Sequence, residues 1–155
     1  TMNSKTSFIV IGLVLLVIYM VGSGIWVSTN DGWYRSLNAP SWQPPDWVFG
    51  VIWPYNFLMI AVSIFQVAKA SPTTRLVYLI AFGLSVVAAL TWANQFYVSH
   101  NLYVAAFALL CVPLLTLFVT ALTFRSSILV GFLLLPYQVW VSIATLLSFS
   151  YASKN

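Results

Sequence analysis

Five long stretches that are apolar and almost free of charge dominate this sequence of 155 residues. They cover about residues 8–27, 47–68, 76–97, 102–124 and 128–151. A helix that crosses the hydrocarbon core of a bilayer needs about 20 consecutive, mostly apolar residues. The apolar runs are continuous and do not alternate with polar residues, which argues against the strands of a membrane barrel. The sequence therefore predicts an all-α integral membrane protein, in which residues 1–155 form one domain of five transmembrane helices.

The composition excludes several classes of function. Only 5% of the residues are charged, whereas about 25% is usual in a soluble domain. The six cations are scattered singly along the chain, so we expect no nucleic-acid partner. Cys111 and His100 are the single residues of their types, and they leave too few ligands for a metal site. We therefore expect membrane lipid around the protein, no metal centre and no obligatory cofactor.

The cations also predict an orientation in the membrane. With five spans, the N-terminus lies on the same side as the short breaks near residues 69–75 and 125–127. That side carries four cations, Lys5, Lys69, Arg75 and Arg125, and the opposite side carries Arg35 and Lys154. Because cytoplasmic loops are richer in Lys and Arg, we expect the N-terminus in the cytoplasm, and residues 28–46 and the C-terminus on the opposite side.

The first apolar stretch has a second interpretation as a signal peptide. Lys5 precedes it, and Gly22-Ser23-Gly24 supplies small residues of the kind found at cleavage sites. Its apolar run is about 20 residues, however, whereas the apolar region of a signal peptide has about 7–15. The length favours a transmembrane helix.

The connection over residues 28–46 is long and rich in Trp and Pro. Pro40, Pro44 and Pro45 fix the backbone locally and exclude a helix interior, so we expect a stiff, structured loop. Tryptophans near a helix end are also typical of the aromatic belt at the membrane surface. A belt alone does not explain three Trp and three Pro within one short segment, and we favour a rigid aromatic lid over a pocket between the helices.

The same segment resembles the signature of the TspO/MBR family, the translocator proteins or tryptophan-rich sensory proteins. The matching residues are Trp33-Tyr34-x-x-Leu37-x-x-Pro40-Ser41-Trp42-x-Pro44-Pro45-x-Trp47-Val48-x-Gly50-x-x-Trp53. Trp92 and the run Pro136-Tyr137-x-x-Trp140-x-x-x-Ala144-Thr145-x-Leu147 resemble the third and fifth helices of that family. The resemblance covers essentially the whole chain.

The resemblance implies a membrane receptor or carrier for a flat hydrophobic ligand. In this family the ligands are tetrapyrroles, such as protoporphyrin IX and haem, or sterol-like lipids, and homodimers are common. An alternative within the family is an enzyme that degrades porphyrin in light. Such an enzyme needs no conventional acid–base site, because the excited porphyrin supplies the reactivity. A small structural subunit of a larger membrane complex is a third hypothesis.

The candidate ligand-binding residues come from three parts of the chain. In the last span, residues 136, 140, 144, 147 and 151 share one helical face, which indicates either ordinary packing or a pocket wall. Asn56 lies one turn from Trp53 and is the polar residue expected to reach the pocket. The predicted set is Trp33, Trp42, Pro45, Trp47, Phe49, Trp53, Asn56, Phe57, Trp92, Trp140, Ala144 and Leu147.

Four positions depart from the family pattern. Ala89 and Ser148 stand where Asn is usual, Phe57 stands where Tyr is common, and Ala39 stands where Lys often precedes Pro40. Elsewhere, Thr116, Thr120 and Thr123 recur at helical spacing, which predicts a helix–helix or dimer contact. Cys111 is expected to be a small buried residue, and His100 is expected to be a solvated loop residue.

Overall fold

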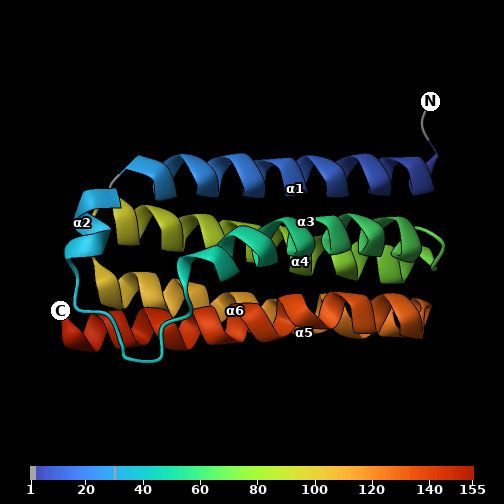
Figure 1. Ribbon diagram of the computed structural model, residues 1–155. Coiled ribbons are helices and arrows are strands. Elements are labelled where there is room, and N and C mark those ends of the chain that lie inside the picture. Colours follow the sequence, from blue (N-terminus) through green and yellow to red (C-terminus); the bar gives the residue numbers. More distant parts are fainter. Residues whose placement is uncertain (1–2, 30) are drawn as a thin grey trace.

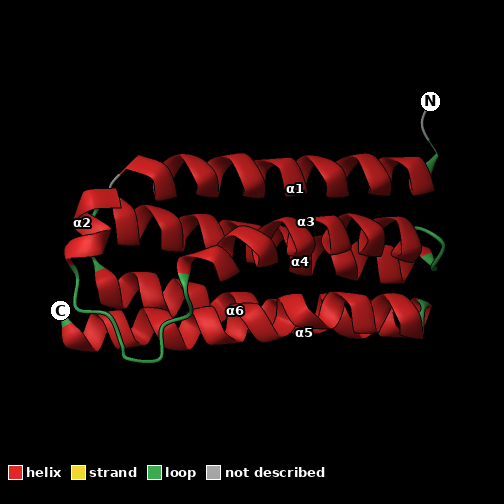
Figure 2. Cartoon of the chain, viewed as in Figure 1, coloured by secondary structure: helices red, strands yellow, loops and turns green. Residues whose placement is uncertain are grey.

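The chain folds into a bundle of long helices. The computed structural model describes residues 3–29 and 31–155, and these contain only helices and loops (Figures 1 and 2). The helices are α1 (Ser4–Thr29), α2 (Asp31–Ser36), α3 (Asp46–Val67), α4 (Pro72–Tyr97), α5 (Leu102–Ser126) and α6 (Ile128–Lys154). All except α2 are long and apolar enough to cross a membrane. The prediction of an all-α protein with five candidate membrane spans is confirmed.

Each long helix runs antiparallel to the next long helix along the chain (Figure 1). The connections that follow α3, α4 and α5 are short, whereas the one between α1 and α3 contains α2. The most extensive packing joins α5 to α4 and to α6, and α1 packs mainly on α4. The N-terminus lies at one end of the bundle, here called the N-terminal end. α2 and the C-terminus lie at the other end, here called the loop end (Figure 1).

Polar residues in the short connections begin each of the last three helices. The Oγ of Ser71 accepts a hydrogen bond from the Thr74 amide at 3.3 Å, directly before Pro72 at the first position of α4. Asn101 and Ser127 cap α5 and α6 in the same way. These side chains satisfy backbone amides that have no partner within a helix, which places the turns where the sequence places its few polar residues.

A proline inside α5 is compensated by side chains of α6. Pro113 has no amide N–H, so the carbonyl of Leu109 loses its usual partner. The hydroxyl of Thr145 donates to this carbonyl at 3.3 Å. One turn away, the side-chain amide of Gln138 donates to the Pro113 carbonyl at 2.9 Å. Neighbouring helices must satisfy such groups in a membrane, and these bonds fix α5 against α6.

The N-terminal half of the bundle is closely packed. Ser63 of α3 bonds with both Tyr78 of α4 at 2.9 Å and Thr123 of α5 at 2.7 Å. Thr116 and Thr120 both donate to the Oε1 of Gln138, at 2.6 Å and 3.3 Å. The predicted threonine face is therefore a buried helix–helix contact within this chain.

The expectation of a buried Cys111 is wrong, because its side chain is exposed on the outer surface of α5.

The predicted loop over residues 28–46 is only partly a loop. Residues 28 and 29 extend α1, residues 31–36 form the short helix α2, and among the described residues of this segment the irregular backbone covers 37–45. The physical reason is the position of the prolines: they start at Pro40, and nothing before them prevents a helical turn. The irregular part runs across the loop end of the bundle before α3 begins (Figure 1).

Candidate ligand-binding cavity

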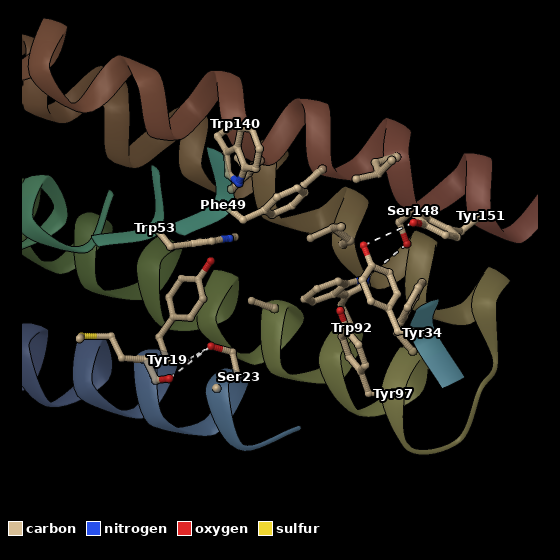
Figure 3. Close-up of a pocket in the computed structure, with 18 of the residues that line it drawn as sticks. Tyr19, Ser23, Tyr34, Phe49, Trp53, Trp92, Tyr97, Trp140, Ser148 and Tyr151 are labelled. Carbon is tan, nitrogen blue, oxygen red and sulfur yellow. Dashed lines mark hydrogen bonds between the residues drawn. The ribbon is translucent and has the colours of Figure 1, made fainter. Parts of the chain in front are cut away.

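A cavity of about 430 Å³ lies among the long helices towards the loop end of the bundle (Figure 3). Half of its lining residues are aromatic: Tyr19, Tyr34, Phe49, Trp53, Phe57, Trp92, Phe96, Tyr97, Trp140 and Tyr151. The others are Met20, Ser23, Gly24, Asp46, Ala89, Leu109, Val141, Ala144, Leu147 and Ser148. Pockets of this kind bury apolar ligands and orient them with few polar groups.

One wall comes from α6, as its helical spacing predicts. Trp140, Ala144, Leu147 and Tyr151 all line the cavity. Pro136 does not, and lies instead beside a separate groove between α3 and α6. The Nε1 of Trp140 is buried and has no hydrogen-bond partner among the described residues. A buried donor without an acceptor is unfavourable.

The opposite wall comes from α1 and α3. The rings of Trp53 and Phe57 stack with centroids 5.5 Å apart, and Tyr19 meets Phe57 edge to face at 5.3 Å. The hydroxyl of Tyr19 bonds with that of Tyr137, which is fully buried, at 3.1 Å. Phe49, near the start of α3, packs edge to face against Trp140 at 5.1 Å. These contacts fix the orientation of the aromatic rings that surround the cavity (Figure 3).

Three of the four departures from the family pattern lie in this lining, and Ala39 does not. Ala89, Phe57 and Ser148 each border the cavity. The indole of Trp92 donates to the Oγ of Ser148 at 3.3 Å. The hydroxyl of Ser148 is therefore hydrogen-bonded to another residue of the cavity wall. Because an alanine and a phenylalanine replace an amide and a phenol, this cavity offers fewer polar groups than the family pattern implies.

A network of polar side chains closes the loop end of the cavity. The hydroxyl of Tyr151 donates to both Gln43 and Tyr34, and the amide of Gln43 donates to the Tyr34 hydroxyl at 3.2 Å. The backbone amide of Asn38 donates to the Oδ1 of Asn155 at 2.9 Å. This bond ties residues 37–45 to the end of α6. The aromatic residue of α2 that faces the cavity is thus Tyr34.

An ion pair lies beside this network. Arg35 of α2 bonds with Asp46, the first residue of α3, at 3.2 Å, and both side chains are largely exposed. Asp46 also borders the cavity. The charged rim of the cavity therefore lies at the level where α3 begins.

The tryptophans predicted to cover the pocket lie outside it. Trp42 and Trp47 have exposed fractions of 48% and 70%, and neither lines the cavity, nor does the exposed Pro45. Trp33 packs behind the cavity, where it stacks on His100 with centroids 3.7 Å apart. The exposed rings of Trp42 and Trp47 instead match the aromatic-belt interpretation.

Two polar residues also differ from expectation. His100 is exposed, as predicted, but its ring has partners, since it stacks on Trp33 and bonds with the Tyr97 carbonyl at 3.1 Å. Asn56 does not line the cavity. It is fully buried, and neither atom of its side-chain amide has a hydrogen-bond partner among the described residues.

The prediction missed the contribution of α1. Tyr19, Met20, Ser23 and Gly24 line the cavity, although the first span shows no polar face that would identify them in advance. The pair Tyr19 and Ser23, one turn apart and the only residues with hydroxyl groups in the run 8–27, was the available signal.

Comparison with known proteins supports the resemblance. The family model described as the TspO/MBR family matches residues 9–153. The chain is 31% identical over 151 residues to Protein CrtK of Rhodobacter capsulatus, covering 92% of this chain and 94% of that protein. It is 31% identical over 150 residues to the Tryptophan-rich protein TspO of Chlorobaculum tepidum, with coverages of 94% and 92%. It is also 29% identical over 138 residues to the human Translocator protein, with coverages of 87% and 82%. The chain belongs to the TspO/MBR family of membrane proteins.

Proposed function

We propose that this protein is a membrane receptor or carrier for a flat, mostly apolar ligand of the tetrapyrrole or sterol-like class. The observation that carries the proposal is the cavity of about 430 Å³ with ten aromatic residues in its lining. Such rings bury large apolar areas and favour stacked or edge-to-face contacts with a planar ligand. The name of the human relative, Translocator protein, is compatible with a carrier.

The few polar groups suggest how such a ligand is oriented. The ring of Trp140 lines the cavity, and its buried N–H has no hydrogen-bond partner among the described residues. Arg35 lies at the rim through its ion pair with Asp46. A guanidinium binds carboxylates through charge-assisted hydrogen bonds, so a ligand carboxylate, such as a porphyrin propionate, is expected to compete with Asp46 for Arg35.

The proposal includes the orientation predicted from the cations. Lys5, Lys69, Arg75 and Arg125 gather at the N-terminal end of the bundle, while Arg35 and Lys154 lie at the loop end. The difference supports a cytoplasmic N-terminal end. The rim of the cavity then faces the opposite side of the membrane.

The test is a titration of protoporphyrin IX into the purified protein, followed by tryptophan fluorescence. The wild-type protein should show saturable quenching. Replacing two wall tryptophans together, Trp53→Phe and Trp140→Phe, should raise the Kd about tenfold or more, because each ring contributes about 0.5–1.5 kcal/mol beyond its buried area.

A matched control is Trp47→Phe, which removes a tryptophan that lies outside the cavity. Its Kd should equal that of the wild type. Quenching that does not saturate, or a Kd unchanged in the double variant, rules out binding in this cavity.

A further inference from the structure

The lining of the cavity is not equally buried on all sides. Among its described residues, the exposed ones are Met20 and Gly24 of α1 and Asp46 at the start of α3. Met20 has an exposed fraction of 43%. The lining residues from α4, α5 and α6 are buried or half-buried. The cavity therefore opens towards the outer surface of the bundle between α1 and the beginning of α3.

Gly24 leaves this opening unobstructed. A Cβ atom placed on Gly24 would meet no atom within 4 Å. Ser23 does not reach across the opening, because its hydroxyl donates to the carbonyl of Tyr19 at 2.5 Å, within its own helix (Figure 3). Met20, one turn from Gly24, is a flexible, unbranched side chain that adapts to different neighbours. A ligand that passes here displaces one mobile side chain and breaks no interhelical hydrogen bond that involves Met20, Ser23 or Gly24.

The opening lies within a membrane-spanning segment. Met20 lies within the candidate span Ser4–Trp26 of α1, about 9 Å before Trp26 at about 1.5 Å per residue. The neighbouring side chains of Val21 and Ile25 are apolar and exposed on the same stretch of helix. An opening with these neighbours faces lipid. The loop end of the cavity, here also called the aqueous end, is closed by the hydrogen bonds among Tyr34, Gln43 and Tyr151.

We infer that the ligand enters and leaves the cavity sideways from the bilayer, between α1 and the start of α3, past Met20 and Gly24. This inference rests on the function proposed above. It adds the route by which the ligand enters and the distribution of apolar and polar groups in the ligand. The apolar sides of the passage select a molecule that dissolves in lipid. The ion pair of Arg35 and Asp46 at the rim selects a polar or anionic group at one end of that molecule.

The experiment measures rates in lipid nanodiscs, with protoporphyrin IX as the probe and rapid mixing followed by quenching of tryptophan fluorescence. Gly24→Phe places a ring in the passage, in space that is empty in the native protein. Val21→Phe is the matched control, because it adds the same ring to an exposed position of α1 that does not line the cavity. Asn155→Ala loosens the aqueous end by removing both hydrogen bonds that the Asn155 side chain makes with the backbone of Asn38, at 2.9 Å and 3.1 Å.

If the route is lateral, Gly24→Phe lowers both the association and the dissociation rate constants about tenfold, as expected when a passage limits exchange. Val21→Phe and Asn155→Ala leave both rates unchanged. Gly24→Leu, a smaller obstruction, gives a smaller decrease of the same kind and replaces Gly24→Phe if that variant does not fold.

Two results overturn the lateral route while leaving the proposed function intact. One is saturable binding with rates unaffected by either substitution of Gly24. The other is faster exchange in Asn155→Ala, which indicates an aqueous route. A wild-type protein without saturable binding instead refutes the proposed function itself.

Discussion

The two halves of the bundle pack in opposite ways, although the same five long apolar helices pass through both. In the N-terminal half, Ser63, Tyr78 and Thr123 hydrogen-bond across three helices, and Phe82 among them is fully buried. In the loop half, rings such as Trp53 and Trp140 border an empty space. Small hydroxyl residues let helices approach closely, whereas large rings that contact each other edge to face hold them apart. Hydrophobicity alone does not distinguish a core from a binding cavity.

The largest expected effect compares one phenylalanine from each half. Phe82→Ala leaves a void in a closely packed region and should lower the free energy of unfolding by about 3–5 kcal/mol. Phe57→Ala should cost less than half as much, because Phe57 already borders the cavity. The measurement is unfolding in mixed detergent micelles with increasing SDS, followed by circular dichroism.

Equal losses in the two variants would contradict the contrast between the halves. They would mean that the cavity is filled or collapses in the membrane protein as purified. Binding of protoporphyrin IX gives a second readout, because Phe57→Ala should weaken it while Phe82, which does not line the cavity, has no direct part in it.

The spans were predictable because each is a long uncharged run, and the requirement for satisfied backbone groups in lipid leaves the helix as the simplest structure. The residues at which the helices begin and end were less predictable. α4 begins at Pro72 rather than near residue 76, because Ser71 and Pro72 form a cap that hydrophobicity does not register. The helix α2 was not foreseen, since six residues show no periodicity and the adjacent prolines indicated a loop.

The cavity was predictable only where helical spacing carries the information. Trp140, Ala144 and Leu147 share a face of α6, and all three line it. Trp42 and Trp47 lie in or beside irregular backbone, where composition does not tell which way a ring points. Tyr19 lies on a helix that is apolar on every side, so its inward direction depends on the packing of α3 and α4 against α1.

A second, smaller effect tests the boundary between the two halves, where Pro113 interrupts the hydrogen bonds of α5. Thr145→Val removes the donor to the Leu109 carbonyl and should cost about 1 kcal/mol. In a Pro113→Ala background the restored amide at position 113 serves that carbonyl, so the same substitution should cost less. A double-mutant cycle of unfolding free energies measures the difference. Equal costs in both backgrounds would show that Thr145 does not compensate for the proline.

The smallest expected effect has the opposite sign and concerns Asn56. Ser63 faces Thr123. Asn56 and Thr116 each lie seven residues, about two turns, nearer the loop end of the same two helices, α3 and α5, which run parallel to each other. Thr116 donates to Gln138 instead, and the Asn56 amide has no partner among the described residues. Asn56 therefore lies where the close packing of the N-terminal half gives way to the open loop half.

Burying an amide without a hydrogen bond is unfavourable. Asn56→Leu should therefore leave the free energy of unfolding unchanged or raise it by up to about 1 kcal/mol. Ser63→Ala is the control, because its hydroxyl is bonded on both sides and its loss should lower stability. If Asn56→Leu instead destabilises the protein as much as Ser63→Ala does, the amide binds water in the folded bundle, and the closely packed half extends two turns further towards the cavity.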